Sequence, residues 1–144
     1  MPFQNKYFVS KYYNEGNNMN RFPSIEEINE ILDEITLEIP DELFKGLNEG
    51  IVLLPEFKVH KKSVEGSPLY VLGEYHSSIT GRHIRIYYGS FEKVYHDHTV
   101  EFLRKKLKET LLHEFTHHLE SLAGESDLEK EDMNNLRRYL RKWE

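Results

Sequence analysis

The sequence predicts a single α+β domain in which helices pack against a small mixed or antiparallel sheet. Capping signals followed by apolar residues at helical spacing occur near the start and near the end of the chain. Between them, short apolar segments bounded by Gly, Pro, Ser and Asn predict strands. A chain of 144 residues is long enough for one domain with its own core. We therefore expect a domain over residues 23–144, preceded by an arm over residues 1–22.

The arm and the first helix differ sharply in pattern. Residues 1–22 are rich in Asn, Tyr and Phe and sustain neither a helical nor a strand period, so we expect either a flexible arm or a segment that precedes a start at Met19. Ser24-Ile25-Glu26-Glu27 is a capping box, and the isoleucines and leucine after it follow helical spacing. This helix should end before Pro40, because a residue that precedes proline avoids the α conformation. A short helix is expected over residues 41–47.

Three segments have the pattern of strands, and they are residues 51–54, 69–76 and 82–88. Pro55 ends the first of these strands, and residues 57–60 are expected to continue it. The other two are joined around residues 78–81. In the last strand, apolar and polar residues alternate, so Ile84 and Ile86 should share one face.

A long helix follows a short helical segment over residues 91–95. Asp97 or Thr99 is expected to cap its N-terminus. Gly124 is expected to end it in the left-handed conformation that follows many helices. A second capping box, Ser126-Asp127-Leu128-Glu129, then opens the last helix.

The long helix carries His113-Glu114-Phe115-Thr116-His117, an HExxH pattern. Residues four apart lie on one helix face, so His113 and His117 would hold one metal ion together. Glu114 would then take a proton from a metal-bound water. The alternative is that both histidines belong to a solvated helix face and that Glu114 is an ordinary surface glutamate.

Helical geometry separates the histidines of this segment by role. At about 100° per residue, with Leu111 set to zero, the apolar residues stay within roughly 80° of the core direction. His113, His117 and Glu120 then lie at about 200°, 240° and 180°, on a face turned away from the core. His118 lies at about −20°, inside the apolar stripe, so we expect it to be buried with its ring nitrogen hydrogen-bonded.

A catalytic zinc site needs a third protein ligand in addition to the two histidines. The turn after Gly124 would bring Glu125 or Asp127 back toward them. Glu120 competes from the helix itself, but it lies about 10 Å beyond His113 along the axis. We favour Asp127, with Glu120 as the alternative or as a residue that orients a ligand histidine. Asp127 could instead serve only to cap the last helix.

Composition excludes several classes of site and partner. There is no cysteine, so disulfides and cysteine-based zinc sites are excluded. The net charge is −6, which argues against nucleic acid as a partner. There are basic clusters at residues 104–108 and 137–142. We expect the first to be a solvated helix face and the second to complement a helix dipole. No apolar segment is long enough for a signal peptide or a membrane span, which favours a cytoplasmic protein.

From about Ile25 to Leu140 the chain resembles the small zincin-like metallopeptidases of bacteria, also called minimal zincins. The matching order is an amphipathic helix, "IPDELFKGLNEGIVLL", a sheet segment with "ITGRHIRIYYGSFEK", and a helix with "LKETLLHEFTHHLE". The resemblance implies a minimal zincin-like fold, Zn²⁺ as the cofactor, His113, His117 and Asp127 as its ligands, and Glu114 as the catalytic base. The family's compact motif has a glycine three residues after the second histidine, whereas Gly124 follows His117 by seven.

The function expected is a zinc-dependent peptidase that hydrolyses a peptide or protein substrate with metal-activated water and Glu114 as general base. A strand at the rim of the sheet, for which we consider residues 82–88, would hold the extended substrate by β-augmentation. The first alternative is a metal-dependent binding or regulatory module on the same fold without turnover. A second alternative is a metal-free structural domain.

Overall fold

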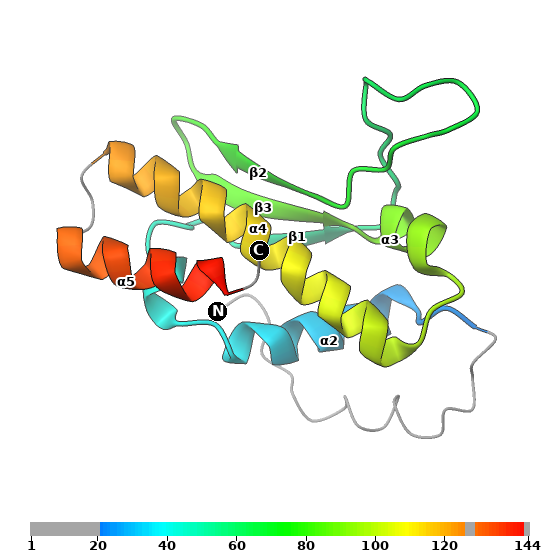
Figure 1. Cartoon of the computed structure of the whole chain (residues 1–144), viewed down its shortest axis with the longest axis horizontal. Helices are drawn as coiled ribbons and strands as arrows, with labels where there is room; N and C mark the ends of the chain where they lie inside the picture. Colours follow the sequence, from blue (N-terminus) through cyan, green and yellow to red (C-terminus); the bar gives the residue numbers. More distant parts are fainter. Residues whose placement is uncertain (1–20, 126–128, 143–144) are drawn as a thin grey trace.

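The computed structural model describes residues 21–125 and 129–142, and these form an α+β domain (Figure 1). The element order is α2 (Ile25–Leu37), η1 (Asp41–Phe44), β1 (Ile51–Leu54), β2 (Gly73–Ser77), β3 (Arg82–Tyr87), α3 (Tyr88–Tyr95), α4 (Val100–Gly124) and α5 (Lys130–Arg141). Helix α4 lies across the sheet, with α2 and α5 packed beside it (Figure 1). The expected fold class is confirmed.

The sheet has the strand order β1-β3-β2 and is mixed. β1 runs parallel to β3, with Ile51 opposite Ile84, and β2 runs antiparallel to β3, with Tyr75 opposite the same Ile84. The expectation that the 82–88 strand lies at the rim is therefore wrong, because β3 is the middle strand. Its two isoleucines are fully buried, as expected for a strand that is paired on both sides. The edges of the sheet belong to β1 and β2.

The segment between β1 and β2 forms a small antiparallel pairing of its own. Val59 is bridged to Tyr70, and the backbone N–H of Val71 donates to the carbonyl of Lys58 at 2.8 Å. Residues 57–60 therefore do not continue β1, and the strand expected from residue 69 begins only at Gly73. The reason is that Pro55 ends β1, after which the chain crosses the end of β3 and pairs with residues that precede β2.

Helix α2 begins as its capping box predicts. The Ser24 hydroxyl accepts a hydrogen bond from the Glu27 backbone N–H at 3.2 Å, and the Glu27 carboxylate accepts one from the Ser24 N–H at 2.7 Å. Arg21 pairs with Glu27, and the Phe22 ring packs edge-on against Tyr88. These two residues, the last of the expected arm, thus contact the domain, while residues 1–20 lie outside the described residues.

Helix α4 has the expected start and a different end. The Thr99 hydroxyl caps it by accepting from the Phe102 N–H at 3.1 Å. Gly124 is the last helical residue, and its φ is not positive, so the left-handed role expected for it is wrong. Glu125 caps the helix instead, with its N–H directed at the carbonyls of Leu122 and Ala123. α5 begins at Lys130 with Glu129 as its N-cap and without a side-chain cap, so the expectation that the second capping box opens the last helix is wrong. Residues 126–128 of that segment are outside the described residues.

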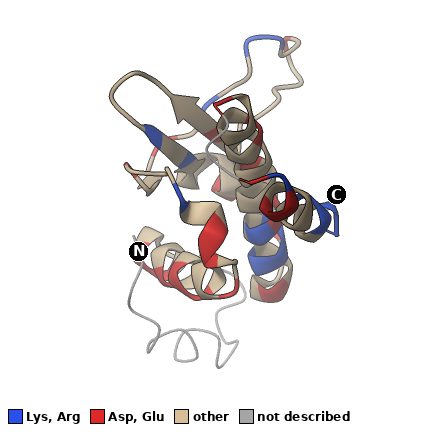
Figure 2. Ribbon diagram, turned by 90° about the vertical axis from the view of Figure 1, so that its left-hand side faces the viewer, with Lys and Arg blue, Asp and Glu red and all other residues tan. Residues whose placement is uncertain are grey.

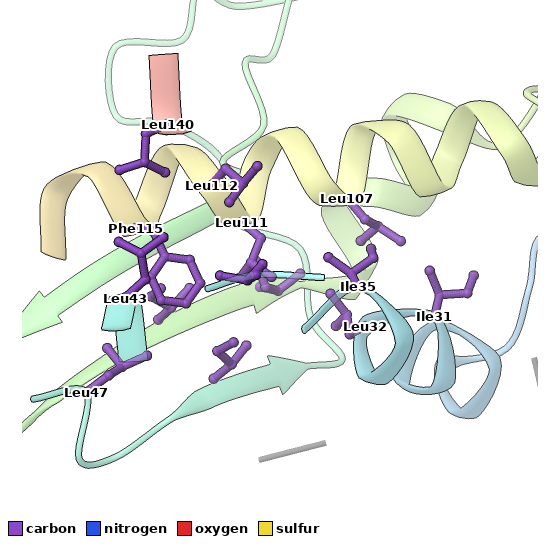
Figure 3. Close-up of a cluster of buried hydrophobic side chains, with 14 of the residues drawn as sticks. Ile31, Leu32, Ile35, Leu43, Leu47, Leu107, Leu111, Leu112, Phe115 and Leu140 are labelled. Carbon is purple, nitrogen blue, oxygen red and sulfur yellow. The ribbon is translucent and has the colours of Figure 1, made fainter. Parts of the chain in front are cut away.

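The core lies between α4, the sheet, α2 and α5 (Figure 3). Leu107, Leu111 and Phe115 of α4 point at its centre and are fully buried. Phe115 packs edge-on against Phe44 at the end of η1, with ring centroids 5.0 Å apart. This packing confirms the apolar stripe of the long helix and fixes which of its faces is left for a site.

The charged residues of α4 and α2 are paired across the two helices. Arg104 contacts Glu34 and Glu38 at 3.0 and 2.6 Å, and Lys108 contacts Glu38 at 2.8 Å. Figure 2 shows Lys and Arg near the C-terminal end of the chain and on the adjoining helix, with acidic residues interspersed. In the described part of the chain, no helix combines the length and the apolar character that crossing a membrane requires.

Candidate metal and catalytic site

The two histidines of the HExxH pattern lie side by side on the outer face of α4. His113 and His117 are both exposed, and their ring centroids are 4.9 Å apart with planes at 89°. Among the described residues, neither ring makes a hydrogen bond to the protein. The face expected from the helical angles is confirmed, and two imidazoles one turn apart are free to turn their nitrogens toward a common point.

Glu114 lies on the buried side of α4, whereas the two histidines lie on its exposed side, and Glu114 is only 6% exposed. In the described part of the chain no N–H or O–H donates to its carboxylate. Burial raises the pKa of Glu114, the nearby His117 acts in the opposite direction, and the carboxylate of Glu74 on β2 adds to the rise. An exposed glutamate on a helix surface would be neither buried nor raised in pKa by burial. The alternative of an ordinary surface residue is therefore wrong for Glu114.

His118 is fully buried and has both ring nitrogens hydrogen-bonded. Its Nε2 is 2.7 Å from the carbonyl oxygen of Lys45, which can only accept, so Nε2 carries the proton. Its Nδ1 is 2.9 Å from the Tyr75 hydroxyl, which then donates to it. Burial lowers the pKa of His118 against the opposing effect of the Lys45 carbonyl, which favours this neutral form. The expected packed role of His118 is confirmed.

The β2 strand contributes a second carboxylate near the site. Glu74 is held by Lys58 at 2.5 Å and by the Tyr87 hydroxyl at 2.7 Å. Although burial acts to raise the pKa of Glu74, hydrogen bonds from Lys58, Tyr87 and His76 lower it to about 2. Glu74 is therefore ionised at neutral pH, and its negative charge contributes to the raised pKa of Glu114.

Two of the candidate third ligands have other partners. Glu125 forms an ion pair with Arg82 of β3, and Glu120 lies 3.3 Å from Arg137 of α5. Asp127, the favoured candidate, lies outside the described residues, so its role stays a prediction. Within residues 21–125 and 129–142, no group of three or more His, Asp or Glu side chains is placed to hold a metal ion.

Helix α4 explains where the extra residues after His117 lie. The helix continues without interruption to Gly124, seven residues beyond His117, or about 10 Å along its axis. The four residues by which the motif exceeds the compact form are thus one additional helical turn. From Gly124, where the helix ends, to Asp127 is three residues, which span at most about 10 Å when extended, so a return of Asp127 toward His117 is within the reach of the chain.

The described residues supply two of the three protein ligands that a catalytic zinc site needs, and a glutamate suited to act as its base. Zinc prefers imidazole and carboxylate ligands when cysteine is absent, and its catalytic sites have three protein ligands. His113 and His117 supply two nitrogens from one exposed face, and Glu114 lies between them and β2. These two histidines would hold the ion together with a third protein ligand, for which Asp127 stays the predicted residue and Glu120 the alternative.

Sequence reasoning missed the burial of Glu114 and the part played by β2. The signal for Glu114 was available, because the same helical angles place it about 60° from the centre of the apolar stripe. For Glu74 and Tyr75 no such signal exists. Their approach to α4 depends on how the sheet is docked against the helix.

Similarity to known proteins bears on the family and the fold of the chain. A family model for zincin-like metallopeptidases matches residues 63–139, which include the HExxH segment. The solved structure of a conserved hypothetical protein from Thermo thermophilus is similar, with 36% identity and a TM-score of 0.61, and the match covers 71% of this chain and 99% of that chain. No curated protein matches the chain. The resemblance inferred from the sequence is thereby confirmed, and the chain belongs to the zincin-like metallopeptidase family.

Proposed function

We propose that this protein is a zinc-dependent peptidase whose metal ligands are His113, His117 and Asp127 and whose general base is Glu114. The observation that carries the proposal is the combination on α4 of two exposed, adjacent imidazoles with a buried glutamate whose pKa is raised. A raised pKa brings a carboxylate closer to the pH at which it can accept a proton and then release it.

The chemistry divides between the ion and the side chains. Bound zinc supplies a Lewis acid that polarises a peptide carbonyl and acidifies water. Glu114 takes a proton from the water that attacks the carbonyl carbon and delivers it to the leaving amine. Its carboxylate is shielded from bulk solvent, so the proton it holds is not readily lost before the amine leaves.

We expect the substrate to lie along β2 rather than β3. The Tyr87 N–H donates to the Leu72 carbonyl at 2.9 Å, so the backbone groups of even-numbered residues in this strand face β3. Those of Gly73, Tyr75 and Ser77 therefore face the free edge of the sheet. An extended peptide or protein segment would pair with these groups by β-augmentation and pass in front of Glu114.

The decisive variant is Glu114→Gln. We expect it to bind zinc as the wild type does and to lose cleavage of a broad peptide library by at least ~100-fold, because only the proton acceptor is removed. Glu109→Gln, five residues earlier on the same helix and paired with Lys106, is the matched control and should retain activity.

Three results would redirect the assignment. Wild-type protein that carries zinc but cleaves no peptide would indicate a metal-dependent binding module instead of an enzyme. Wild-type protein that is purified without chelator and carries no metal would indicate a structural domain. Glu114→Gln protein that still cleaves peptides would remove Glu114 from the reaction.

A further inference from the structure

One face of α4 meets β2 at two points that lie on either side of Glu114. Thr110, Glu114 and His118 are spaced four residues apart, so they form a line along the helix. Thr110 and His118 both touch β2, whereas Glu114 between them makes no hydrogen bond among the described residues. The buried carboxylate of Glu114 thus lies on the helix between two contacts with the edge strand.

The first contact is the hydrogen bond from Tyr75 to His118. Because Nε2 of His118 is committed to the Lys45 carbonyl, the neutral ring offers a single acceptor, Nδ1, to the Tyr75 hydroxyl. The ring is fully buried, so water cannot replace either partner without opening the core. This chain of two hydrogen bonds joins β2, α4 and the segment after η1.

The second contact is the close approach of Gly73 to Thr110. A Cβ at Gly73 would lie 3.0 Å from Cγ2 of Thr110 and 3.2 Å from the carbonyl oxygen of Arg85. The strand and the helix therefore leave little room for a side chain at this point. A methyl group here would require Thr110 or β2 to shift by a few tenths of an ångström, on the side of Glu114 opposite to the Tyr75 contact.

We propose that Tyr75 and His118 are positioning residues that, together with the Gly73–Thr110 contact, set the distance between Glu114 and a peptide bound along β2. The proposal rests on the proposed peptidase function. A strand held at two points cannot drift from the helix, so the scissile carbonyl of a substrate on its free edge stays at a fixed distance from the Glu114 carboxylate. Neither contact involves His113 or His117.

Tyr75→Phe tests the first contact, since it removes one hydroxyl and keeps the ring. We expect kcat to fall by about tenfold or more, because small displacements of a reacting group are costly, while KM and zinc content stay within about twofold. Tyr95→Phe is the matched control, because the Tyr95 hydroxyl makes no hydrogen bond among the described residues and its ring packs against other aromatic rings, and its kcat should not change. A Tyr75→Phe protein with unchanged kcat, or with kcat lowered only in proportion to lost zinc, would overturn the proposal.

Gly73→Ala with Thr110→Ser tests the second contact through size compensation. Gly73→Ala alone should lower kcat, and the added Thr110→Ser, which deletes the Cγ2 atom in the way, should restore part of it. A double variant no better than Gly73→Ala would argue against the helix–strand distance as the cause. Thr110→Ser alone, as the reference, should keep kcat within about twofold.

A readout without turnover separates this proposal from the peptidase assignment. In nitrogen-15 spectra of metal-free protein, His118 should appear as the neutral tautomer protonated at Nε2, with an Nδ1 resonance that shifts in Tyr75→Phe. Hydrogen exchange of the β2 amides should be faster in the same variant. A His118 ring protonated at Nδ1, or β2 exchange equal to wild type, would exclude the positioning role even if the protein cleaves peptides.

Discussion

Glu125, the residue that caps the C-terminus of α4, forms an ion pair with Arg82 at the start of β3. The pair ties the end of the helix to the sheet. Glu125 lies eight residues beyond His117, which is about 12 Å along a helix axis, and its carboxylate is directed toward Arg82. It is therefore badly placed to complete a metal site with the two histidines.

The first prediction concerns the third metal ligand. Asp127→Asn should weaken zinc affinity by at least ~100-fold, because a direct ligand is lost and effects of supporting residues alone reach only about 10- to 100-fold. Glu125→Gln and Glu120→Gln should change the affinity by less than about threefold, since their carboxylates pair with Arg82 and Arg137. Competition with a chromophoric chelator measures all three. A large loss in Glu120→Gln with none in Asp127→Asn would make Glu120 the ligand.

The second prediction concerns acid stability. The pKa of Glu74 is about 2 in the folded protein, below its ordinary value of 4.5. As the pH falls, Glu74 is therefore protonated in the unfolded chain at a higher pH than in the folded protein. The stabilisation is fully present above about pH 5 and is lost as the pH falls toward 2. Glu74→Gln should lower the free energy of unfolding by on the order of 1–2 kcal/mol at pH 7, with a difference from wild type that vanishes near pH 2.

Urea unfolding of metal-free protein at several pH values checks this behaviour of Glu74. Glu65→Gln is the control, because Glu65 is exposed and lies in the turn before β2. A difference between Glu74→Gln and wild type that is independent of pH would show that the effect is not linked to ionisation of Glu74.

The third prediction concerns the start of α2. Ser24→Ala removes the hydroxyl that accepts from the Glu27 N–H, and it should destabilise the protein by about 1 kcal/mol. Ser24→Gly should lower the free energy of unfolding by only a few tenths of a kcal/mol. Thermal unfolding measures these variants. The exposed Ser67 makes no side-chain hydrogen bond among the described residues, so Ser67→Ala should have no effect in that assay. Equal losses in the two alanine variants would contradict the capping role.

The fourth prediction concerns the core beneath the site. Phe115→Ala should destabilise the protein by about 3–5 kcal/mol, because Phe115 is fully buried against Phe44 and its removal leaves a cavity. Val64→Ala, at a side chain that is 69% exposed, should stay within about 0.5 kcal/mol of wild type. Chemical unfolding measures both, and a small loss for Phe115→Ala would mean that the helix is held by other contacts.

Local signals predicted most of the helices and the face of α4 that carries the site. The Ser24 and Thr99 caps, the burial of His118 and the exposure of His113 and His117 all depend on residues within a few turns of one another, so the sequence is sufficient for them. The left-handed role expected for Gly124 failed because a glycine at a helix end is permitted, not obliged, to adopt positive φ.

The sequence did not predict which strands pair with one another. Residues 82–88 have the alternation of a half-buried strand, and that pattern does not say whether one or both edges are paired. The pairing of β1 with β3 and the contact of Tyr75 with His118 join residues 33 and 43 positions apart. Contacts at such separation are decided by tertiary packing, and this is why the position of β2 beside Glu114 became visible only in the structure.

The strand order also has a consequence for the sequence of folding events. β2 and β3 are joined by a turn in which the Ser78 N–H donates to the Gly81 carbonyl at 2.9 Å, and hairpins of this kind form in roughly 1–10 μs. β1 must instead close a loop of about 30 residues before it can pair with β3, which carries a larger entropic penalty. β2, the strand along which we propose that the substrate binds, should thus be paired with β3 before β1 docks, and β1 completes the sheet at its opposite edge.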